Sequence, residues 1–311
     1  MTNAGTLRDR ELLVFDGACG TSLQGLDLPV STWDGREGCN EWLNVTAPDV
    51  IRDIHAGFVA AGAQVLETNT FGASRIVLAE YGLEDRVAEI NTAAVQAARA
   101  AAADNPDVFV AGSMGPTTKL VSLGHIELDP LEEAYTEQAA ALLAAGVDAL
   151  ILETCQDLLQ VKTAVRAALD AVEHAGRDVP LMVSVTIEQT GTLLVGSDIA
   201  AVCATLEPFP IFSLGLNCAT GPEAMASQIR YLAHQWPGRI SCMPNQGLPE
   251  VVAGRTVYPM SPQDFAARML RYVEQEGLSI VGGCCGTTPA HIRDLVAALQ
   301  GVHPAARDVV V

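Results

Sequence analysis

The chain has 311 residues, of which 49% are hydrophobic and only 5% aromatic, and its formal net charge is −19. This length and apolar content allow a large buried core, while the negative charge argues against nucleic acid and against an anionic membrane surface as partners. Residues 1–11 are polar, and no apolar run reaches the roughly 20 residues needed to span a bilayer. We therefore expect a cytoplasmic protein whose eight cysteines are reduced thiols.

Short β-type segments alternate with helical segments along the chain. The segments expected to form strands are 12–15, 64–67, 108–111, 149–153, 181–186, 211–216, 239–243 and 279–281. The expected helices are 47–62, 84–103, 129–146, 156–175, 197–206, 222–233, 261–276 and 288–299. Several of these helices begin with Asp, Ser or Thr beside Pro and end at Gly, as helix ends prefer.

Eight strand–helix units in about 300 residues predict a single (β/α)8 barrel, because consecutive βαβ units of one hand close the sheet on itself. A doubly wound open sheet is the alternative, and it is weakened because no Gly-x-Gly-x-x-Gly turn follows the first strand. We expect one domain over residues 1–311, with its core at about 11–300 and loose ends at 1–10 and 302–311.

Unusual polar clusters follow the ends of the expected strands. They are residues 16–21, 67–71, 112–116, 153–155, 217–218, 244–247 and 282–289. In a barrel the C-terminal ends of all strands meet at one rim, where barrel enzymes keep their active sites. The sequence therefore predicts a single site at this rim.

Two adjacent cysteines stand in the stretch Gly-Gly-Cys-Cys-Gly-Thr-Thr-Pro at residues 282–289. Neighbouring strand residues point to opposite faces, but the flanking glycines let the chain bend so that the sulfurs of Cys284 and Cys285 face one spot. With Cys218 they make a three-thiolate site possible, which suits Zn²⁺ with an exchangeable fourth position. The alternatives are buried thiols that pack as small hydrophobes, or a disulfide between Cys284 and Cys285.

Zinc at such a site would hold an incoming thiol as a thiolate at neutral pH and leave it nucleophilic, so the expected chemistry is alkyl transfer to sulfur. Asp16 and Glu153 could hold the ammonium of an amino acid, and backbone N–H groups of Gly17 and its neighbours could bind the carboxylate. The alternatives are a turn cap for Asp16 and an ion pair with an arginine for Glu153.

Residues 53–55 (Asp-Ile-His) resemble the start of a cobalamin-binding Asp-x-His-x-x-Gly loop. Gly57 falls one position early and the segment lies within an expected helix, so we expect His55 to be a packing or helix-surface residue. The cysteines without paired spacing are expected to be packing thiols: Cys19, Cys39, Cys155, Cys203 and Cys242.

The strand-end motifs, in this order, resemble the homocysteine methyltransferase family over about residues 11–300. The most specific are 282–289 and Asn217-Cys218. The stretches 215–222 and 244–249 are most similar to the homocysteine-binding module of the cobalamin-dependent methionine synthase branch, and less so to the betaine-dependent or S-methylmethionine-dependent branches.

This resemblance implies a (β/α)8 barrel, zinc bound by three cysteines, and residues placed around the substrate. The implied zinc ligands are Cys218, Cys284 and Cys285; Asp16 and Glu153 lie near the homocysteine amine, and the backbone of Gly17, Ala18 and Cys19 lies near its carboxylate. Asn245 matches the residue that fills the fourth zinc position until the substrate sulfur displaces it. One departure is Cys19, which stands where that branch usually has Met.

The expected function is zinc-dependent methyl transfer to L-homocysteine, forming methionine. No motif of this chain matches those that bind a corrinoid or folate, so the expected methyl donor is methylcobalamin on a separate corrinoid protein or on further modules. The alternatives are S-methylmethionine or a betaine-like donor used without a partner, and a non-catalytic zinc- or thiol-binding barrel.

Overall fold

The computed structural model describes residues 5–103, 105–248, 250–252 and 255–309, so Pro249 of the motif at 244–249 lies outside the described residues. Eight strands form one parallel sheet in the order β1-β10-β7-β6-β5-β4-β3-β2. They are β1 (Leu13–Val14), β2 (Val65–Glu67), β3 (Phe109–Met114), β4 (Ala149–Cys155), β5 (Leu181–Val185), β6 (Ser213–Cys218), β7 (Arg239–Pro244) and β10 (Ile280–Val281). All eight predicted strands are confirmed, with small shifts at their ends.

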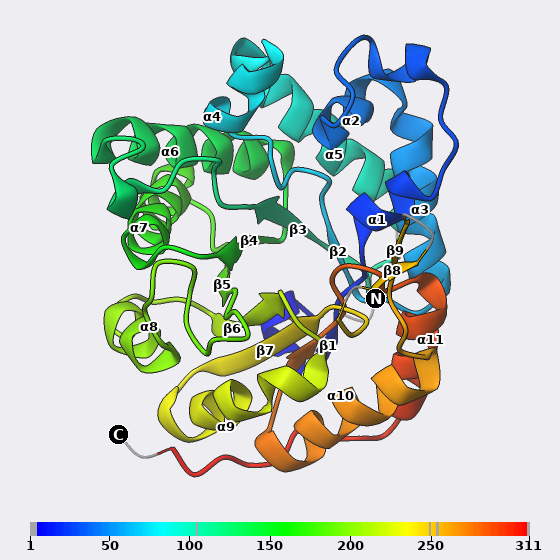
Figure 1. Cartoon of the computed structure of the whole chain (residues 1–311), viewed down its shortest axis with the longest axis vertical. Helices are drawn as coiled ribbons and strands as arrows, with labels where there is room; N and C mark the ends of the chain where they lie inside the picture. Colours follow the sequence, from blue (N-terminus) through cyan, green and yellow to red (C-terminus); the bar gives the residue numbers. More distant parts are fainter. Residues whose placement is uncertain (1–4, 104, 249, 253–254, 310–311) are drawn as a thin grey trace.

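The two outer strands of that order, β1 and β2, meet and close the sheet. Phe15 forms a parallel bridge with Val65, the Gln64 N–H donates to the Val14 carbonyl (2.8 Å), and the Asp16 N–H donates to the Val65 carbonyl (2.9 Å). The predicted (β/α)8 barrel is therefore confirmed, and the open-sheet alternative is wrong. Helices surround the ring of strands (Figure 1).

The main helices follow the strands as predicted. They are α3 (Pro48–Ala60), α5 (Val87–Ala102), α6 (Leu128–Ala145), α7 (Leu158–Ala175), α8 (Ile199–Leu206), α9 (Ala226–Gln235), α10 (Pro262–Glu276) and α11 (Pro289–Ala298). Their ends show the expected chemistry: Asp157 caps α7 by accepting from the Leu159 and Gln160 N–H groups, and Gly176 ends it in a left-handed conformation. In the described residues no helix has both the length and the apolar character to cross a membrane.

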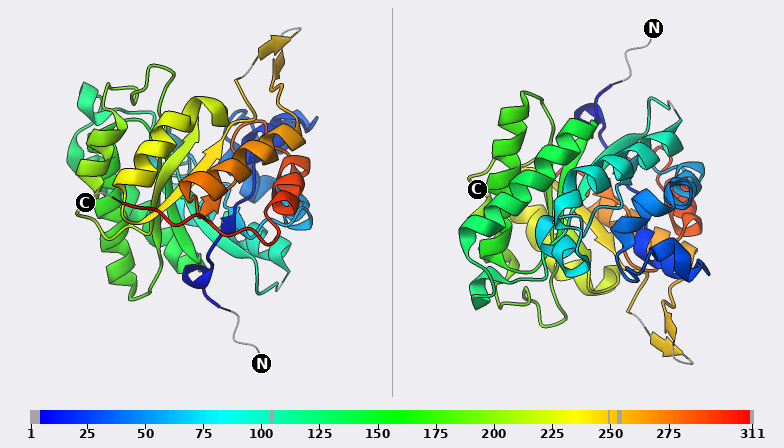
Figure 2. Two further views of the ribbon diagram at one scale, coloured as in Figure 1. Left: turned by 90° about the horizontal axis from the view of Figure 1, so that it is seen from below. Right: turned by 90° about the horizontal axis from the view of Figure 1, so that it is seen from above.

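Several short elements were not predicted, because segments of three to six residues are too brief to show a hydrophobic period. They are α1 (Cys19–Gln24), α2 (Leu43–Thr46), α4 (Arg75–Leu78), the hairpin of β8 (Glu250–Val252) and β9 (Arg255–Val257), and the 3-10 turns η1 (Leu7–Asp9), η2 (Val30–Trp33), η3 (Asn40–Trp42), η4 (Ala79–Tyr81) and η6 (Val121–Leu123). The 3-10 turns η5 (Glu84–Arg86) and η7 (Pro222–Met225) instead form the first turns of the predicted helices 84–103 and 222–233. The β8–β9 hairpin projects away from the barrel (Figure 2).

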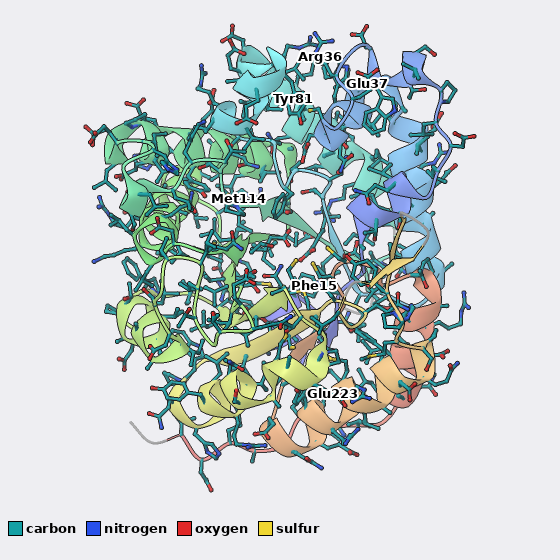
Figure 3. The ribbon with its side chains drawn as sticks, viewed as in Figure 1. Phe15, Arg36, Glu37, Tyr81, Met114 and Glu223 are labelled. Carbon is teal, nitrogen blue, oxygen red and sulfur yellow. The ribbon has the colours of Figure 1, made fainter. Side chains whose placement is uncertain are left out.

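The core has two layers, as a barrel requires. A small cluster fills the inside of the ring, with Phe15 near its middle (Figure 3), and a larger one packs between the strands and the helices. Leu7 is buried in the inner cluster, and the Ala305 N–H donates to the Val273 carbonyl (3.0 Å). The expectation of loose ends is therefore wrong for the described residues near both termini, which pack against the barrel.

Candidate active site

A cavity of about 240 Å³ opens among the C-terminal ends of the strands. Its walls come from the C-terminal ends of β2, β3, β4, β6 and β7, from the segments after β1, β2 and β10, and from η3. Among its lining residues are three glutamates (Glu41, Glu67 and Glu153) and four cysteines (Cys19, Cys218, Cys284 and Cys285). Most of the polar clusters that the sequence placed at the strand ends thus surround one hollow.

Three sulfur atoms meet at one side of this cavity. The Cys218 Sγ lies 3.9 Å from the Cys285 Sγ, the Cys284 Sγ lies 4.0 Å from the Cys285 Sγ, and all three fall within 4.8 Å of one another. Tetrahedral zinc with bonds of about 2.3 Å would separate its sulfur ligands by about 3.8 Å. The donor set and its spacing therefore fit Zn²⁺, and all three cysteines are free thiols, half-buried and facing the cavity.

The backbone fixes these sulfur positions. Cys218 and Ala219 have positive φ angles of 61° and 50°, which non-glycine residues rarely adopt, so β6 ends in a strained left-handed turn. The Cys284 N–H donates to the Pro244 carbonyl (2.8 Å), and the Cys285 N–H donates to the Asn245 Oδ1 (3.1 Å). The loops after β6, β7 and β10 are thus joined by their own hydrogen bonds.

Contacts among the three thiols shift their pKa values in opposite directions. Hydrogen bonds from Cys218 and then Cys284 lower the pKa of the Cys285 thiol to about 3, whereas the Cys218 contact raises the pKa of Cys284 well above its ordinary value. The contacts with its two neighbours therefore favour the thiolate form of Cys285. Asn245 lies against this cluster and is 4% exposed; its Oδ1 retains a second lone pair beyond the bond to Cys285.

Glu153 faces the cavity from the end of β4. Its Oε1 accepts a hydrogen bond from Ser113 Oγ (2.5 Å) and its Oε2 accepts one from Asn217 Nδ2 (3.2 Å). Burial raises the pKa of Glu153 to about 7. No arginine pairs with it among the described residues, so the ion-pair alternative is not what the structure shows.

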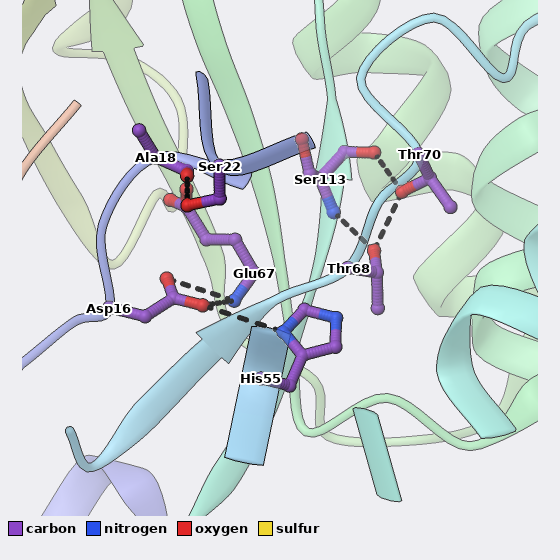
Figure 4. Close-up of polar contacts among 8 residues, drawn as sticks. All are labelled: Asp16, Ala18, Ser22, His55, Glu67, Thr68, Thr70 and Ser113. Atoms are coloured by element: carbon purple, nitrogen blue, oxygen red, sulfur yellow. Dashed lines mark hydrogen bonds and ion pairs between the residues drawn. The ribbon is translucent and has the colours of Figure 1, made fainter. Parts of the chain in front are cut away.

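Asp16 is 3% exposed and does not line the cavity, although the next residue, Gly17, does. Its carboxylate accepts from the backbone N–H of Glu67 (3.2 Å and 3.3 Å) and lies 3.7 Å from Nδ1 of His55 (Figure 4). Asp16 thus fastens the end of β2 through this hydrogen bond. His55 is fully buried in α3, in agreement with a packing role.

Glu67 is the carboxylate whose role the sequence did not reveal. It stands at the end of β2, its side chain lines the cavity, and its buried Oε1 has no hydrogen-bond partner among the described residues. Burial, and then the charges of Glu153 and Asp16, raise the pKa of Glu67 well above its ordinary value. In the sequence, Glu67 could have been recognised as a site residue because it is the first residue of the polar cluster 67–71.

The segment after β1 lines the cavity with backbone. The Ala18 N–H donates to the Thr287 carbonyl (3.2 Å), whereas the described hydrogen bonds include no acceptor for the N–H groups of Gly17, Cys19 and Gly20. A Cβ on Gly17 would lie 2.6 Å from Thr287 Oγ1, so this close approach requires glycine. Of the three residues expected near a substrate carboxylate, Ala18 already has its N–H occupied.

The remaining cysteines divide into two groups. The buried ones are Cys39, Cys155, Cys203 and Cys242, and their burial agrees with the predicted packing role. Cys19 is half-buried: it packs against the core cluster of Leu23, Leu43, Ile51 and Ala97, as predicted, and it also lines the cavity. Burial raises the pKa of Cys19, which keeps it a neutral thiol.

Comparison with known proteins identifies the class to which this fold and site belong. The family model described as homocysteine S-methyltransferase matches residues 13–299, and the chain belongs to that family. The resemblance that the strand-end motifs suggested is thereby confirmed.

Among individual proteins, the chain is 45% identical over 304 residues to methionine synthase of Mycobacterium tuberculosis and 46% identical over 298 residues to that of Mycobacterium leprae. These matches cover 96% and 94% of this chain but 26% and 25% of those proteins, so the chain spans about a quarter of their length. The crystal structure of the homocysteine methyltransferase MmuM from Escherichia coli, oxidized form, superposes with a TM-score of 0.74 at 26% identity, covering 94% of this chain and 97% of that one.

Proposed function

We propose that this chain binds L-homocysteine in the rim cavity and transfers a methyl group to its sulfur, forming methionine, with Zn²⁺ held by Cys218, Cys284 and Cys285. The observation that carries the proposal is the spacing of the three sulfurs, which suits one zinc ion, in the same cavity as buried carboxylates. Bound zinc supplies a Lewis acid that keeps a coordinated thiol ionised at neutral pH. Asn245, against the Cys285 N–H, is the proposed occupant of the fourth position.

The chain's own groups would orient the amino acid around its sulfur. The cavity carries carboxylates on its walls and no arginine or lysine among its lining residues, so it favours the ammonium end of the substrate there. The N–H groups of Gly17, Cys19 and Gly20 are the proposed donors to the substrate carboxylate. Methyl transfer then forms a sulfur–carbon bond while the donor's bond to the methyl group breaks.

We favour methylcobalamin on a partner protein or on further modules as the methyl donor. The large hydrophobic side chains that are exposed in the described residues all follow the C-terminal end of a strand, in a loop or a first helical turn: Leu26, Val30, Phe71, Leu123, Leu128, Leu159, Leu194 and Leu248. Phe71 is the one among them that lines the cavity, and exposed apolar side chains on the side of the barrel that carries the site suit the docking of another protein. The limited coverage of the methionine synthases, about a quarter of their length, supports the same donor.

The second candidate is a small methyl donor, such as S-methylmethionine or a betaine-like compound, used without a partner. It is favoured by the structural match to the Escherichia coli homocysteine methyltransferase. A non-catalytic zinc-binding barrel is the third candidate. Buried carboxylates in the same cavity count against it, because storage of a metal by thiolates does not need them.

Metal content tests the zinc site directly. The wild type should bind one equivalent of zinc, and Cys284→Ser should lose most of it. Cys203→Ala is a matched control, since Cys203 is buried in α8 and should leave zinc binding intact. Equal zinc in the wild type and in Cys284→Ser would exclude the proposed ligands.

Substrate and donor are tested on the zinc-loaded protein. Adding L-homocysteine should change the zinc-edge X-ray absorption spectrum from three sulfur ligands to four, whereas an unchanged spectrum would favour the non-catalytic barrel. Methionine formation should require methylcobalamin with a corrinoid-binding partner. Activity with S-methylmethionine alone would make the small-donor alternative the correct one.

A further inference from the structure

We propose that Glu67 is the residue that recognises the ammonium group of the substrate, together with Glu153, while Asp16 only holds β2 in place. This inference rests on the proposed function, because it takes the ligand to be a small α-amino acid with a thiol. It differs from what the family resemblance implied, which set Asp16 beside Glu153 at the amine.

The first argument is the use of the carboxylate oxygens. Both oxygens of Glu153 already accept hydrogen bonds, and Asp16 is engaged by the Glu67 N–H and lies beside His55. The third cavity glutamate, Glu41, accepts from the Gly72 N–H (2.7 Å). Only Glu67, among the carboxylates of the described cavity, has a buried oxygen without any partner.

A buried acceptor without a donor is costly, and native structures rarely keep one unless a ligand, an ion or water satisfies it. Glu67 lines the cavity, whereas Asp16 does not. Figure 4 shows the two carboxylates pointing apart, with the Asp16 carboxylate at the backbone of β2 and the Glu67 side chain directed toward the segment at Ala18 and Ser22. The donor that completes Glu67 must therefore enter from the cavity side.

The second argument is the sign and number of charges around Glu67. The groups that face it are Asp16 below, Glu153 across the cavity, and the thiol of Cys19 on the segment after β1. His55 lies on the far side of Asp16. Two carboxylates beside Glu67 make a cation the favoured occupant, and an ammonium group offers three N–H donors to share between Glu67 and Glu153.

The raised pKa of Glu67 agrees with this geometry. Burial, and then the charges of Glu153 and Asp16, raise the pKa of Glu67 and so favour its protonated form. An ammonium ion placed between Glu67 and Glu153 lowers the pKa of Glu67 again, because it brings a positive charge beside the carboxylate and supplies the missing N–H donors.

A pair of ligands isolates the ammonium contact: L-homocysteine, and 4-mercaptobutanoate, which has the same thiol and carboxylate but no amine. Calorimetric titration of the zinc-loaded wild type should show weaker binding of 4-mercaptobutanoate. In Glu67→Gln the affinity for L-homocysteine should fall by about 10- to 100-fold, the usual effect of one hydrogen bond to a charged group. The affinity for 4-mercaptobutanoate should stay within about twofold, so discrimination between the two ligands is lost.

Two variants serve as controls. Asp16→Asn should keep the wild-type ratio of the two affinities, since its carboxylate does not line the cavity. Glu41→Gln removes one negative charge from the same cavity but keeps an acceptor for the Gly72 N–H, and it should also keep the ratio. Far-UV circular dichroism and urea unfolding establish that each variant is folded.

Each outcome of these titrations tests either the assignment of Glu67 or the proposed function. If Glu67→Gln keeps the wild-type ratio, or if Asp16→Asn loses it instead, the assignment of Glu67 is overturned while the proposed function stands. If the wild type binds both ligands equally, no carboxylate recognises the amine and the assignment is again overturned. If the zinc-loaded wild type does not bind L-homocysteine at all, the proposed function fails and the assignment fails with it.

Discussion

At the scale of single residues, one amide side chain joins the ends of three strands. Asn217 Oδ1 accepts from the Thr154 N–H (2.9 Å) and from Ser184 Oγ (2.7 Å), while its Nδ2 donates to Glu153 (3.2 Å) and to Thr154 Oγ1 (2.8 Å). An amide can make four such bonds, and here all are made. Thr154 has a positive φ of 58°, so Asn217 also holds a strained residue beside Glu153.

Replacing Asn217 by Asp should therefore damage both stability and binding. The new carboxylate cannot donate to Glu153 and brings a second negative charge against it in a buried place. We expect Asn217→Asp to lower the free energy of unfolding by about 2–5 kcal/mol and to weaken homocysteine binding. Urea unfolding and calorimetry measure the two effects. Ser184→Ala, which removes one of the four bonds, should cost about 1 kcal/mol; equal costs for the two variants would contradict this account.

The sequence located the groups of the site better than it assigned their roles. Cys218, Cys284 and Cys285 could be grouped because each follows a strand, and strand ends share one rim. The choice between Asp16 and Glu67 could not be made in this way. Whether a strand-end side chain points into the cavity or back to the backbone depends on the turn that follows, which a single sequence does not specify.

At the scale of elements, β6 and β7 approach so closely that one position admits only glycine. Gly215 stands opposite Ser241 in the parallel register, and a Cβ on Gly215 would overlap the Ser241 side chain and carbonyl. Gly57 in α3 provides the contrast: a Cβ there would meet Pro289 Cγ at 3.5 Å, an ordinary contact. The two glycines thus differ in their surroundings, although both lie inside regular elements.

The matched substitutions should move stability in opposite directions. Gly215→Ala forces β6 away from β7 and should lower the free energy of unfolding by about 3 kcal/mol or more. Gly57→Ala should raise it by about 0.5–1 kcal/mol, because alanine loses less backbone entropy in a helix. Urea denaturation of both variants measures the difference. A Gly215→Ala protein as stable as the wild type would show that the strand spacing relaxes freely.

A second prediction concerns the turn η3, which Glu41 ties to the segment after β2. Burial raises the pKa of Glu41 above its ordinary value of 4.5. The folded state therefore binds this proton more tightly than the unfolded chain, and the wild type loses stability as pH rises from 4.5 toward the folded pKa.

Glu41→Gln does not titrate and keeps the acceptor for the Gly72 N–H. Its unfolding free energy minus that of the wild type should therefore grow with pH above 4.5, by up to about 1.4 kcal/mol per pH unit, and level off at the folded pKa. Urea unfolding of both proteins between about pH 4 and 8 measures this difference. A constant difference across the range would mean that Glu41 titrates normally.

The long elements were predictable and the short ones were not. Helices α6 and α7 carry apolar residues over 18 residues each and both end at a glycine, and α7 also begins with a capping aspartate. The short helix α1 and the hairpin β8–β9 have too few residues for a period, and their conformation depends on the barrel that they pack against or project from.

At the scale of the whole molecule, the contacts that close the barrel do not involve the three proposed zinc ligands. The ring closes through hydrogen bonds between β1 and β2, and the loops that carry the cysteines are joined by backbone bonds of their own. The hydrogen bonds that hold the barrel together are therefore distinct from the thiols of the proposed zinc site.

Removal of zinc should therefore leave the fold intact. After chelation we expect an unchanged far-UV circular dichroism spectrum and a melting temperature lower by about 5 °C, which is the stabilisation lost when a ligand of the native state is withdrawn. Cys218→Ser should show no such decrease on chelation. Loss of the helical signal in the chelated wild type would contradict an independent barrel.

The proposed ligands lie late in the chain, at residue 218 and at residues 284 and 285, on the sixth and eighth strands of the ring. A ribosome that makes this chain must therefore finish the eighth strand before any three thiolates can meet. During synthesis the nascent protein can offer only the sulfur of Cys218 from this set, so the proposed three-thiolate site can form only once the barrel is complete.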